Sequence, residues 1–375
     1  MIDLQQSREK IDKIDKQLVA LFEERMLLAK DVAMYKLQTG KKILDREREI
    51  SKLTALGEMA SNDFNKHGVQ ELFTQIMSMS RKLQYSLLSK NESDISFVEI
   101  EEIQTNKETK VVCFGDKGSY TEQAMEEFFK KPISPIYAKT FRDIMELIKD
   151  GTAEYGVMPI ENTSTGGIAD IYDLLVEFDN YIIGEHVIKV EHALLGLKDA
   201  KLSDIKQVFS HSQGLMQCSK YLKMHENMKP VESVSTADSA KRVVAENDIS
   251  NAAIASMKAA ECYGLRVLET CINHEHNNST RFIIISNKPI YLKNSNKISI
   301  CFELPHTSGS LYNMLSHFIY NNLNMTKIES RPLEGRNFEY RFFVDFEGNL
   351  EDAGVKNALL GIKEEAVDLK ILGNY

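Results

Sequence analysis

The sequence predicts a multidomain chain with an all-helical domain, a two-lobed α/β domain and a C-terminal α+β domain of the ferredoxin-like type. Three observations support this. Residues 2–39 contain neither Gly nor Pro and repeat apolar residues at helical spacing. From Lys110 onward, short apolar runs alternate with helix-like segments. Residues 296–375 then follow the order strand, helix, strand, strand, helix, strand.

The first domain, residues 1–90, is expected to contain three helices. The first has an apolar stripe formed by Leu4, Ile11, Ile14, Leu18, Leu21, Leu28, Val32 and Tyr35. Asp45 is expected to cap a second helix over 46–60, and apolar residues from Val69 to Leu87 indicate a third. Three such helices bury too little apolar surface alone, so we expect a dimer with interlocked helices.

Residues 91–108 contain six acids, few large apolar residues and no clear period, and we interpret them as a solvated linker. Residues 109–288 follow. Their alternating strands and helices predict an α/β domain with largely parallel sheets. The length of this domain suits two lobes with a cleft between them. Residues 296–375 form the ferredoxin-like domain.

Composition and charge argue against several classes of function for this chain, as four observations show. The net charge is −9 without a basic strip, so nucleic acid is not an expected partner. No apolar run reaches the roughly 18 residues of a membrane helix, and the N-terminus lacks a signal peptide, so we expect a cytoplasmic protein. The five cysteines form no C-x-x-C pair and are expected to be reduced and mostly buried. The spacing of His274-Glu275-His276 fits no metal site, so no metal is expected.

The helical domain has charged residues on its apolar stripe. Arg25 continues the heptad spacing, and Lys36 lies 11 residues further on, roughly 20° around the helix. Four polar residues accompany them on the other two helices: Arg48, Glu49, Ser80 and Gln84. Taken one at a time, each of these residues could be an ordinary surface residue, or a long side chain that extends its charged end to solvent. Together they describe a polar pocket, which is costly to bury unless a ligand pairs with it. A small dianion is the natural ligand.

This set resembles the all-helical chorismate mutases over residues 1–90, through Arg8, Arg25, Lys36, Asp45, Arg48, Glu49, Ser80 and Gln84. The resemblance implies that Arg8 and Arg25 bind carboxylates, and that Lys36 and Gln84 approach the ether oxygen. Glu49 would position the hydroxyl, while Asp45, Arg48 and Ser80 complete the pocket. Because Arg8 lies roughly 25 Å along the helix from Arg25, we expect it to reach the pocket of a partner subunit. The rearrangement of chorismate to prephenate is pericyclic, so no cofactor is expected.

The α/β domain carries three polar motifs: GDKGSYT (115–121), PIENTSTGG (159–167) and STRF (279–282). The first is a strand–turn–helix whose backbone N–H groups could bind an anion. In this order the motifs resemble the prephenate dehydratases over residues 109–288, which implies a fold like that of periplasmic binding proteins. Prephenate loses its ring hydroxyl together with its ring carboxylate. Only the first loss needs a proton donor, and neither needs a metal or cofactor.

By this resemblance Thr280 acts on the leaving hydroxyl, in a positional role within a proton-donating network. The substrate-binding residues would be Ser119, Glu161, Asn162, Thr163, Ser210 and Gln217. Arg281 is either a carboxylate ligand or a structural ion pair. His211 is interpreted as structural.

The last domain carries Gly309-Ser310-Leu311-Tyr312 at a helix start and Glu329-Ser330-Arg331-Pro332 in a strand. These motifs resemble the ACT regulatory domains of prephenate dehydratases, with Ser310 in place of the usual Ala. The resemblance implies a phenylalanine site at Gly309, Ser310, Leu311, Glu329, Ser330 and Arg331. Such sites form between paired domains, so a dimer or tetramer is expected.

The whole chain is therefore similar to a bifunctional enzyme of phenylalanine synthesis that phenylalanine inhibits. Because the linker separates the mutase from the other domains, we expect inhibition mainly of dehydration. Two alternatives stay open: a non-catalytic amino-acid sensor, and an enzyme that retains only one of the two activities.

Overall fold

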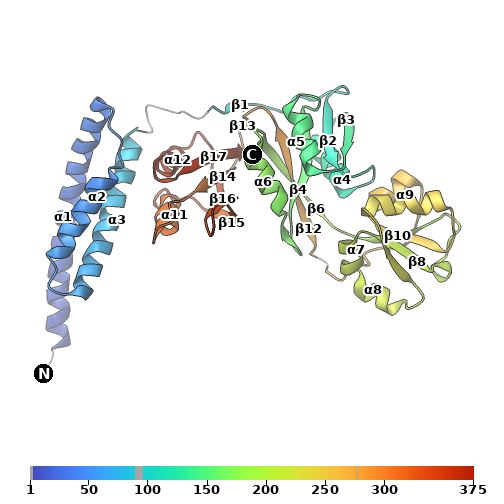
Figure 1. Ribbon diagram of the computed structural model, residues 1–375, viewed down its shortest axis with the longest axis horizontal. Helices are drawn as coiled ribbons and strands as arrows, with labels where there is room; N and C mark the ends of the chain where they lie inside the picture. The colour runs from blue at the N-terminus through green and yellow to red at the C-terminus, as the bar shows by residue number, and fades with distance from the viewer. Residues whose placement is uncertain (1–2, 89–95, 276) are drawn as a thin grey trace. The chain divides into compact units, whose positions relative to one another are not determined.

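The computed structural model describes residues 3–88, 96–275 and 277–375. The chain divides into two compact units (Figure 1). One contains Met1–Ile95 and Ile300–Lys370, and the other contains Ser96–Ser299 and Ile371–Tyr375. Segments far apart in the sequence therefore share a unit.

The N-terminal helices of the first unit are α1 (Leu4–Thr39), α2 (Arg46–Glu58) and α3 (Asp63–Leu88). Asp3 caps the start of α1, and Gly40 ends it in the left-handed conformation with φ of 66°. The Asp45 side chain accepts a hydrogen bond from the backbone N–H of Arg48 at the start of α2. The prediction of three helices is confirmed.

The apolar stripe of α1 is exposed within this single chain. Exposure ranges from 41% for Val32 to 62% for Leu4, and it affects all eight predicted members: Leu4, Ile11, Ile14, Leu18, Leu21, Leu28, Val32 and Tyr35. The stripe therefore leaves apolar surface uncovered in the single chain, and the interlocked dimer stays a prediction.

Residues 297–375 follow the predicted β-α-β-β-α-β order. The elements are β14 (Lys297–Glu303), α11 (Ser310–Tyr320), β15 (Met325–Pro332), β16 (Tyr340–Glu347), α12 (Ala353–Glu365) and β17 (Asp368–Asn374). The strand order β15-β16-β14-β17 agrees with the predicted ferredoxin-like fold.

Helix α3 packs against both α11 and α12. At this contact the Lys82 Nζ donates a hydrogen bond to the Ser316 Oγ at 2.7 Å. Burial lowers the pKa of Lys82 to about 8. The linker therefore does not keep the helical segment apart from the C-terminal segment, and the reason given for restricting inhibition to the dehydratase was wrong.

The predicted linker is not wholly without secondary structure. Residues 89–95 lie outside the described part of the chain, but β1 (Val98–Ile100) pairs in parallel with β13 (Ile290–Leu292). Phe97 packs edge-on against Tyr181, with ring centroids 5.2 Å apart. The acids around these apolar residues concealed a short strand.

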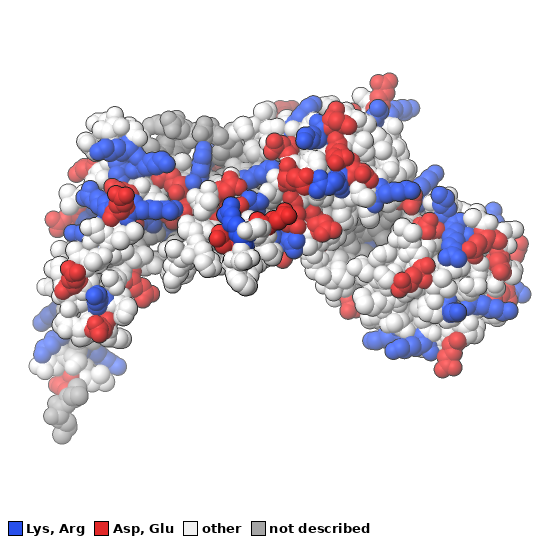
Figure 2. All heavy atoms as spheres, viewed as in Figure 1, with Lys and Arg blue, Asp and Glu red and all other residues white. Residues whose placement is uncertain are grey.

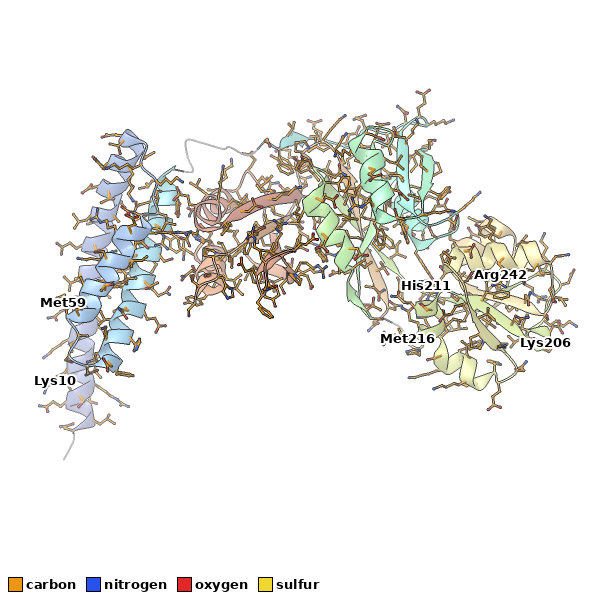
Figure 3. The ribbon with its side chains drawn as sticks, in the orientation of Figure 1. Lys10, Met59, Lys206, His211, Met216 and Arg242 are labelled. Carbon is orange, nitrogen blue, oxygen red and sulfur yellow. The ribbon has the colours of Figure 1, made fainter. Side chains whose placement is uncertain are left out.

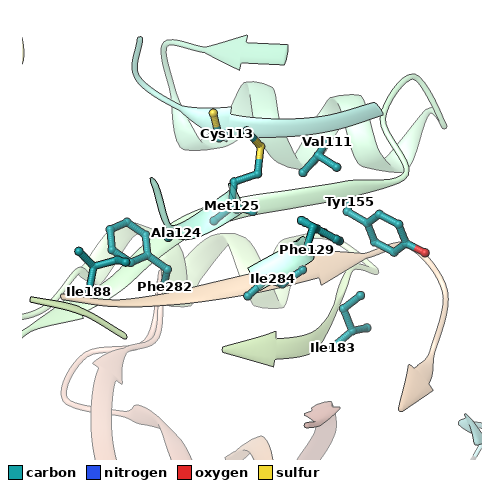
Figure 4. Packing of buried hydrophobic residues seen from close by; sticks show 11 residues of the cluster. Val111, Cys113, Ala124, Met125, Phe129, Tyr155, Ile183, Ile188, Phe282 and Ile284 are labelled. Atoms are coloured by element: carbon teal, nitrogen blue, oxygen red, sulfur yellow. The ribbon is translucent and has the colours of Figure 1, made fainter. Parts of the chain in front are cut away.

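The first lobe of the second unit is built on β2 (Lys110–Phe114), β3 (Ser134–Ala138), β4 (Tyr155–Asn162), β6 (Tyr181–Lys189) and β12 (Ser279–Ser286). Its helices are α4 (Tyr120–Phe129), α5 (Phe141–Lys149) and α6 (Ala169–Glu177), and β5 (Gly166–Gly167) pairs with β4. Figure 4 shows its core, in which Met125 and Phe129 of α4 pack with strand residues such as Val111, Phe282 and Ile284.

The second lobe contains β7 (Ala193–Gly196), β8 (Gln207–Ser210), β9 (Lys229–Glu232), β10 (Asn251–Ala255) and β11 (Arg266–Glu269). Its helices are η1 (Leu202–Asp204), α7 (Ser212–Gln217), α8 (Ser219–Met224), α9 (Thr236–Glu246) and α10 (Met257–Tyr263). Two lobes were predicted and are found. The sheets, however, are mixed rather than largely parallel, because β12 pairs antiparallel with β4 and β6, and β7 does so with β10 and β11.

Lys and Arg side chains are interspersed with Asp and Glu on the face shown in Figure 2. Across the described ranges, no helix has the length and apolarity needed to cross a membrane. Cys113, Cys218 and Cys301 are buried and all five cysteines are free, as predicted. His276 lies outside the described residues. The remainder of the described chain has no cluster of three or more metal-ligating side chains.

Candidate active sites

A cavity of about 310 Å³ lies among the three N-terminal helices and is called the helical cavity. Seven of the eight residues predicted for this site line it: Arg25, Lys36, Asp45, Arg48, Glu49, Ser80 and Gln84. The eighth, Arg8, does not. Because Arg8 and Arg25 belong to the same straight helix, one chain cannot bring both to this cavity.

Hydrogen bonds to neighbouring elements hold the two interior cations of α1. The Arg25 guanidinium donates to the Ser80 Oγ on α3. The Lys36 Nζ donates to the backbone carbonyl of Ile43 at 2.5 Å, in the loop before α2. The packing of α1 against α3 and against this loop therefore fixes both cations.

The helical cavity has an excess of positive charge. Five cations line it (Arg25, Lys36, Arg48, Lys52 and Arg81), against two acids (Asp45 and Glu49). Burial lowers the pKa of both Arg25 and Lys36, because nearby carboxylates offset the cost of desolvation only in part. The Oε1 of Gln84 is buried and accepts no hydrogen bond from the described residues. A small dianion would supply the missing interactions.

A second cavity, of about 400 Å³, lies in the cleft between the two lobes of the second unit. Four of the predicted residues line it: Ser119, Asn162, Gln217 and Thr280. His211 also lines it. This residue, labelled in Figure 3, caps α7 by accepting a hydrogen bond from the Gln213 N–H at 3.3 Å, in agreement with the expected structural role.

Thr280 lies directly opposite Asn162 where β12 pairs with β4. The Asn162 Nδ2 donates to the Thr280 Oγ1 at 2.9 Å and to the Asn278 Oδ1 at 2.7 Å. The Asn162 Oδ1 accepts from the backbone N–H of Ser164 at 2.8 Å, which fixes the orientation of the amide. Since the Thr280 oxygen already accepts a hydrogen bond, its own proton can be donated into the cleft.

The same network continues through Asn278 to other residues that line the cleft. The Asn278 Nδ2 donates to the Gln217 Oε1 at 3.0 Å, and this oxygen also faces the His192 Nε2 at 2.9 Å. Because Oε1 can only accept, the His192 Nε2 must carry the proton and Nδ1 faces the Tyr120 hydroxyl at 3.1 Å. Burial lowers the pKa of His192, which keeps the imidazole neutral. His192, Asn278 and Tyr120 were not predicted as site residues.

Four other predicted residues do not line the cleft cavity. Ser210 is fully buried and donates to the Ile254 carbonyl at 2.8 Å. The Arg281 Nε lies 2.8 Å from Glu161, and its Nη1 lies 3.1 Å from Glu185. Of the two alternatives for Arg281, these contacts favour the structural ion pair. The Thr163 Oγ1 is bonded to the carbonyl of Asn277 and to the N–H of Ser279, and joins two loops.

The glycine-rich turn does not offer the backbone donors that its sequence suggested. The Gly118 N–H donates to the Glu122 carboxylate at 2.6 Å, and the Gly115 N–H to the Ala138 carbonyl at 2.9 Å. The Ser119 N–H donates to the Asp116 carbonyl at 3.1 Å. The chain's own acceptors therefore satisfy these three groups, so they do not form the backbone anion site that such a turn could offer.

A third cavity, of about 400 Å³, lies beside the start of α11 and is called the C-terminal cavity. Ser310 and Leu311 line it, together with Pro305, Phe338 and Tyr340. Gly309 caps α11 with φ of 80°, a conformation that favours glycine. The predicted residues 329–331 lie on β15 and do not line this cavity. One chain therefore does not bring the two motifs into one cavity.

Comparison with known proteins identifies the family. Residues 7–85 match the family model described as Chorismate mutase type II, and residues 111–290 match Prephenate dehydratase. A relative from Enterobacter agglomerans, a "Bifunctional chorismate mutase/prephenate dehydratase", is 33% identical over 98% of this chain and 94% of its own length. The chain belongs to the bifunctional chorismate mutase/prephenate dehydratase family.

Two solved structures each resemble 71% of this chain. The prephenate dehydratase of Arthrobacter aurescens, in complex with L-Phe, shares 28% identity and a TM-score of 0.64 over 71% of this chain and 89% of its own. GqqA, described as a novel type of quorum quenching acylase, shares 29% identity and a TM-score of 0.66 over 71% of this chain and 97% of its own.

Arg81 also lines the helical cavity and directly contacts a predicted residue, although it was not predicted as a site residue itself. Arg81 of α3 lies with its Nη1 at 2.6 and 2.7 Å from the two carboxylate oxygens of Glu49. Burial lowers the pKa of Arg81, but the charges of Glu365 and Glu49 outweigh it and raise that pKa above its usual range. Arg81 is adjacent in sequence to Ser80, which the apolar stripe did reveal.

Proposed function

We propose that the chain catalyses two consecutive reactions, the rearrangement of chorismate to prephenate and the conversion of prephenate to phenylpyruvate. One observation carries this: the two polar residue sets line two separate cavities, each of small-molecule size. The helical cavity has the charge that a dianion requires. The cleft has a hydroxyl donor held by a network, as a dehydration requires.

In the helical cavity the protein has only to select the reactive conformer of chorismate and stabilise the charge that develops on its ether oxygen. Arg25 binds a carboxylate. Lys36 and Gln84 lie near the ether oxygen, and the unpaired amide of Gln84 supports this role. Glu49 accepts a hydrogen bond from the hydroxyl of the substrate. Asp45 caps the start of α2 and so positions Arg48.

A second copy of the chain completes this cavity in our proposal. The exposed apolar stripe of α1 supplies the surface for association, and Arg8 is on α1 but outside its own chain's cavity. An antiparallel or crossed pair of α1 helices would carry Arg8 to the partner's cavity. The dimer thus accounts for both the exposed stripe and the missing carboxylate ligand.

In the cleft, Thr280 donates a hydrogen bond to the ring hydroxyl of prephenate. This hydroxyl takes up one proton that comes from solvent and leaves as water, while the ring carboxylate leaves as carbon dioxide and its bonding electrons complete the aromatic ring. Asn162 holds Thr280 in the donor orientation, and Gln217 and Ser119 contact the substrate. Threonine itself is a very weak acid, so its contribution is the placement of the proton. No step of either reaction calls for a metal or a cofactor.

The C-terminal segment is proposed to be an ACT domain that binds phenylalanine and inhibits the enzyme. Its fold, Gly309 at the start of α11 and the adjacent cavity support this role. The related dehydratase was solved with L-Phe. Residues 329–331 do not reach this cavity within one chain, so we assign them to the cavity of a partner's domain in a dimer or tetramer.

The proposed domains are 1–90 for the mutase, 109–288 for the dehydratase and 296–375 for the regulatory domain. We place the two-lobed domain in the periplasmic-binding-protein-like class on the basis of its two mixed sheets joined around a cleft. The cytoplasm is the proposed location, as expected for biosynthetic enzymes.

A single assay tests the proposed function. The purified chain is supplied with chorismate and no cofactor, and the formation of phenylpyruvate is followed over time. Phenylpyruvate should appear after a lag in which prephenate accumulates. Prephenate that accumulates without further reaction would leave only the mutase. Unchanged chorismate, together with phenylalanine binding, would support the non-catalytic sensor instead.

A further inference from the structure

The last turn of α12 lies against the helical cavity of the same unit. Its final two residues, Glu364 and Glu365, are adjacent acids. The structure connects each of them to a residue that we assign to catalysis, Lys36 or Glu49. Neither connection is visible in the sequence, because α12 begins more than 250 residues after α3 ends.

Glu365 connects to Glu49 through Arg81. The Arg81 Nε lies 3.0 Å from the Glu365 Oε1, while its Nη1 contacts both oxygens of Glu49. The side chains of Arg81 and Glu365 are 9% and 10% exposed, so water weakens this pair little. Burial raises the pKa of Glu365, but the nearby His317 and the charge of Arg81 lower it by more, and the acid stays ionised.

Glu364 connects to Lys36 through the loop before α2. The Glu364 Oε2 accepts hydrogen bonds from the backbone N–H of Leu44 and from the Tyr85 hydroxyl, both at 3.0 Å. The preceding residue, Ile43, provides the carbonyl that accepts from Lys36. Arg46 strengthens the same contact by donating to the Glu365 carbonyl at 3.1 Å, at the negative end of the α12 dipole.

We propose that Arg81 is a positioning residue of the mutase and that the end of α12 holds it in place, so that the mutase cavity is complete only with the C-terminal segment. This inference rests on the proposed role of Glu49. Arg81 leaves the carboxylate of Glu49 free to accept the substrate hydroxyl, since each oxygen has a second lone pair. Without Arg81, Glu49 would rotate toward solvent, from which it is now partly shielded.

The test uses the full-length chain and measures kcat and KM for chorismate, with the dehydratase rate on added prephenate as an internal reference. Arg81→Gln should lower the mutase kcat about 10- to 100-fold, the cost typical of a misplaced catalytic group. Glu365→Gln keeps the shape of α12 and removes one charge, and it should lower kcat about 3- to 10-fold. The double variant should match Arg81→Gln alone, because both changes break one chain of contacts.

Two controls separate positioning from a general loss of structure. Glu351→Gln removes a carboxylate paired with Lys356 near the other end of α12 and should leave the mutase unchanged. Arg81→Lys keeps one charge without the second donor and should restore part of kcat. The dehydratase rate should stay within about twofold in every variant.

The outcomes are separable. If Glu49→Gln alone leaves the mutase rate intact, the proposed role of Glu49 fails. If Glu49→Gln lowers the rate while Arg81→Gln and Glu365→Gln do not, the positioning role fails and the proposed function stands. A rise in KM with kcat unchanged would make Arg81 a direct ligand of the substrate and would also overturn the inference. Additive effects in the double variant would show that α12 does not act through Arg81.

Discussion

Thr280→Val should remove the dehydratase activity and leave the mutase intact. The replacement keeps the branched shape and deletes only the hydroxyl on β12. The Asn162 amide loses one acceptor but keeps its 2.7 Å hydrogen bond to Asn278, so the network is not left wholly unsatisfied. The expected cost in stability is that of one ordinary hydrogen bond, about 0.5–1.5 kcal/mol.

The expected effect on the rate is larger than the effect on stability. Removal of a positioned proton-transfer group typically lowers a rate about 10²- to 10⁴-fold. At least the lower figure is expected here, which corresponds to about 2.7 kcal/mol of transition-state stabilisation. The assay follows phenylpyruvate from added prephenate and, separately, prephenate from chorismate. Thr280→Ser keeps the hydroxyl and should recover much of the dehydratase rate.

Ser210→Ala is the matched control. It also deletes one hydroxyl in the same unit, but this hydroxyl is buried and donates to the Ile254 carbonyl. The variant should lose stability and keep its dehydratase kcat. A Thr280→Val enzyme that retains more than about a third of the normal rate would refute the assignment of Thr280.

Three further predictions concern the remaining sites. Arg8→Ala and Arg25→Ala should each inactivate the mutase, and random mixed dimers should recover toward about a quarter of wild-type activity, since half of the dimers would hold one intact site; verified mixed dimers without activity would show that Arg8 does not complete the partner's cavity. Burial lowers the pKa of Lys82 to about 8 against about 10.4 when unfolded, so the unfolded chain binds more protons between these values. The free energy of unfolding of the first unit should therefore rise from pH 8 to about 10.4, by at most about 3 kcal/mol. Hydrogen exchange of α3 measures this free energy, and it should show no such rise in the Lys82→Met variant. Gly309→Val should abolish inhibition by phenylalanine and its binding in calorimetry, whereas Gly335→Val, at another left-handed glycine of the same segment, should keep both; equal losses in the two variants would attribute the effect to strain alone.

The features that the sequence predicted well are those with local causes. The first helix was visible because its apolar stripe repeats without Gly or Pro, and Arg25 was visible because a cation interrupts that stripe. The C-terminal fold followed from the order of its elements. In each case neighbours in sequence carry the signal, and the tertiary structure only confirms it.

The hydrogen-bond state of a polar group was not predictable in this way. The turn at Gly118 has the composition of an anion site, yet Glu122 of the following helix already occupies its N–H. Ser210 resembles a substrate ligand in its motif, yet it faces the Ile254 carbonyl in the core. A motif identifies the region of a site, but the partner of each donor depends on packing that its spacing does not determine.

Arg81 shows where periodicity stops being informative. Ser80 was found because it lies on the apolar stripe of α3, whereas Arg81 is about 100° further around the helix and lies off that stripe. It is buried because α12 covers that side, and its partner Glu365 is 284 residues away in the sequence. Periodicity finds pocket residues that face their own domain's core and misses those that a distant segment encloses. The same reasoning applies to Arg8, whose cavity must come from a second chain if it binds chorismate at all. In both cases the sequence of the helical domain alone does not show which segment the cation contacts.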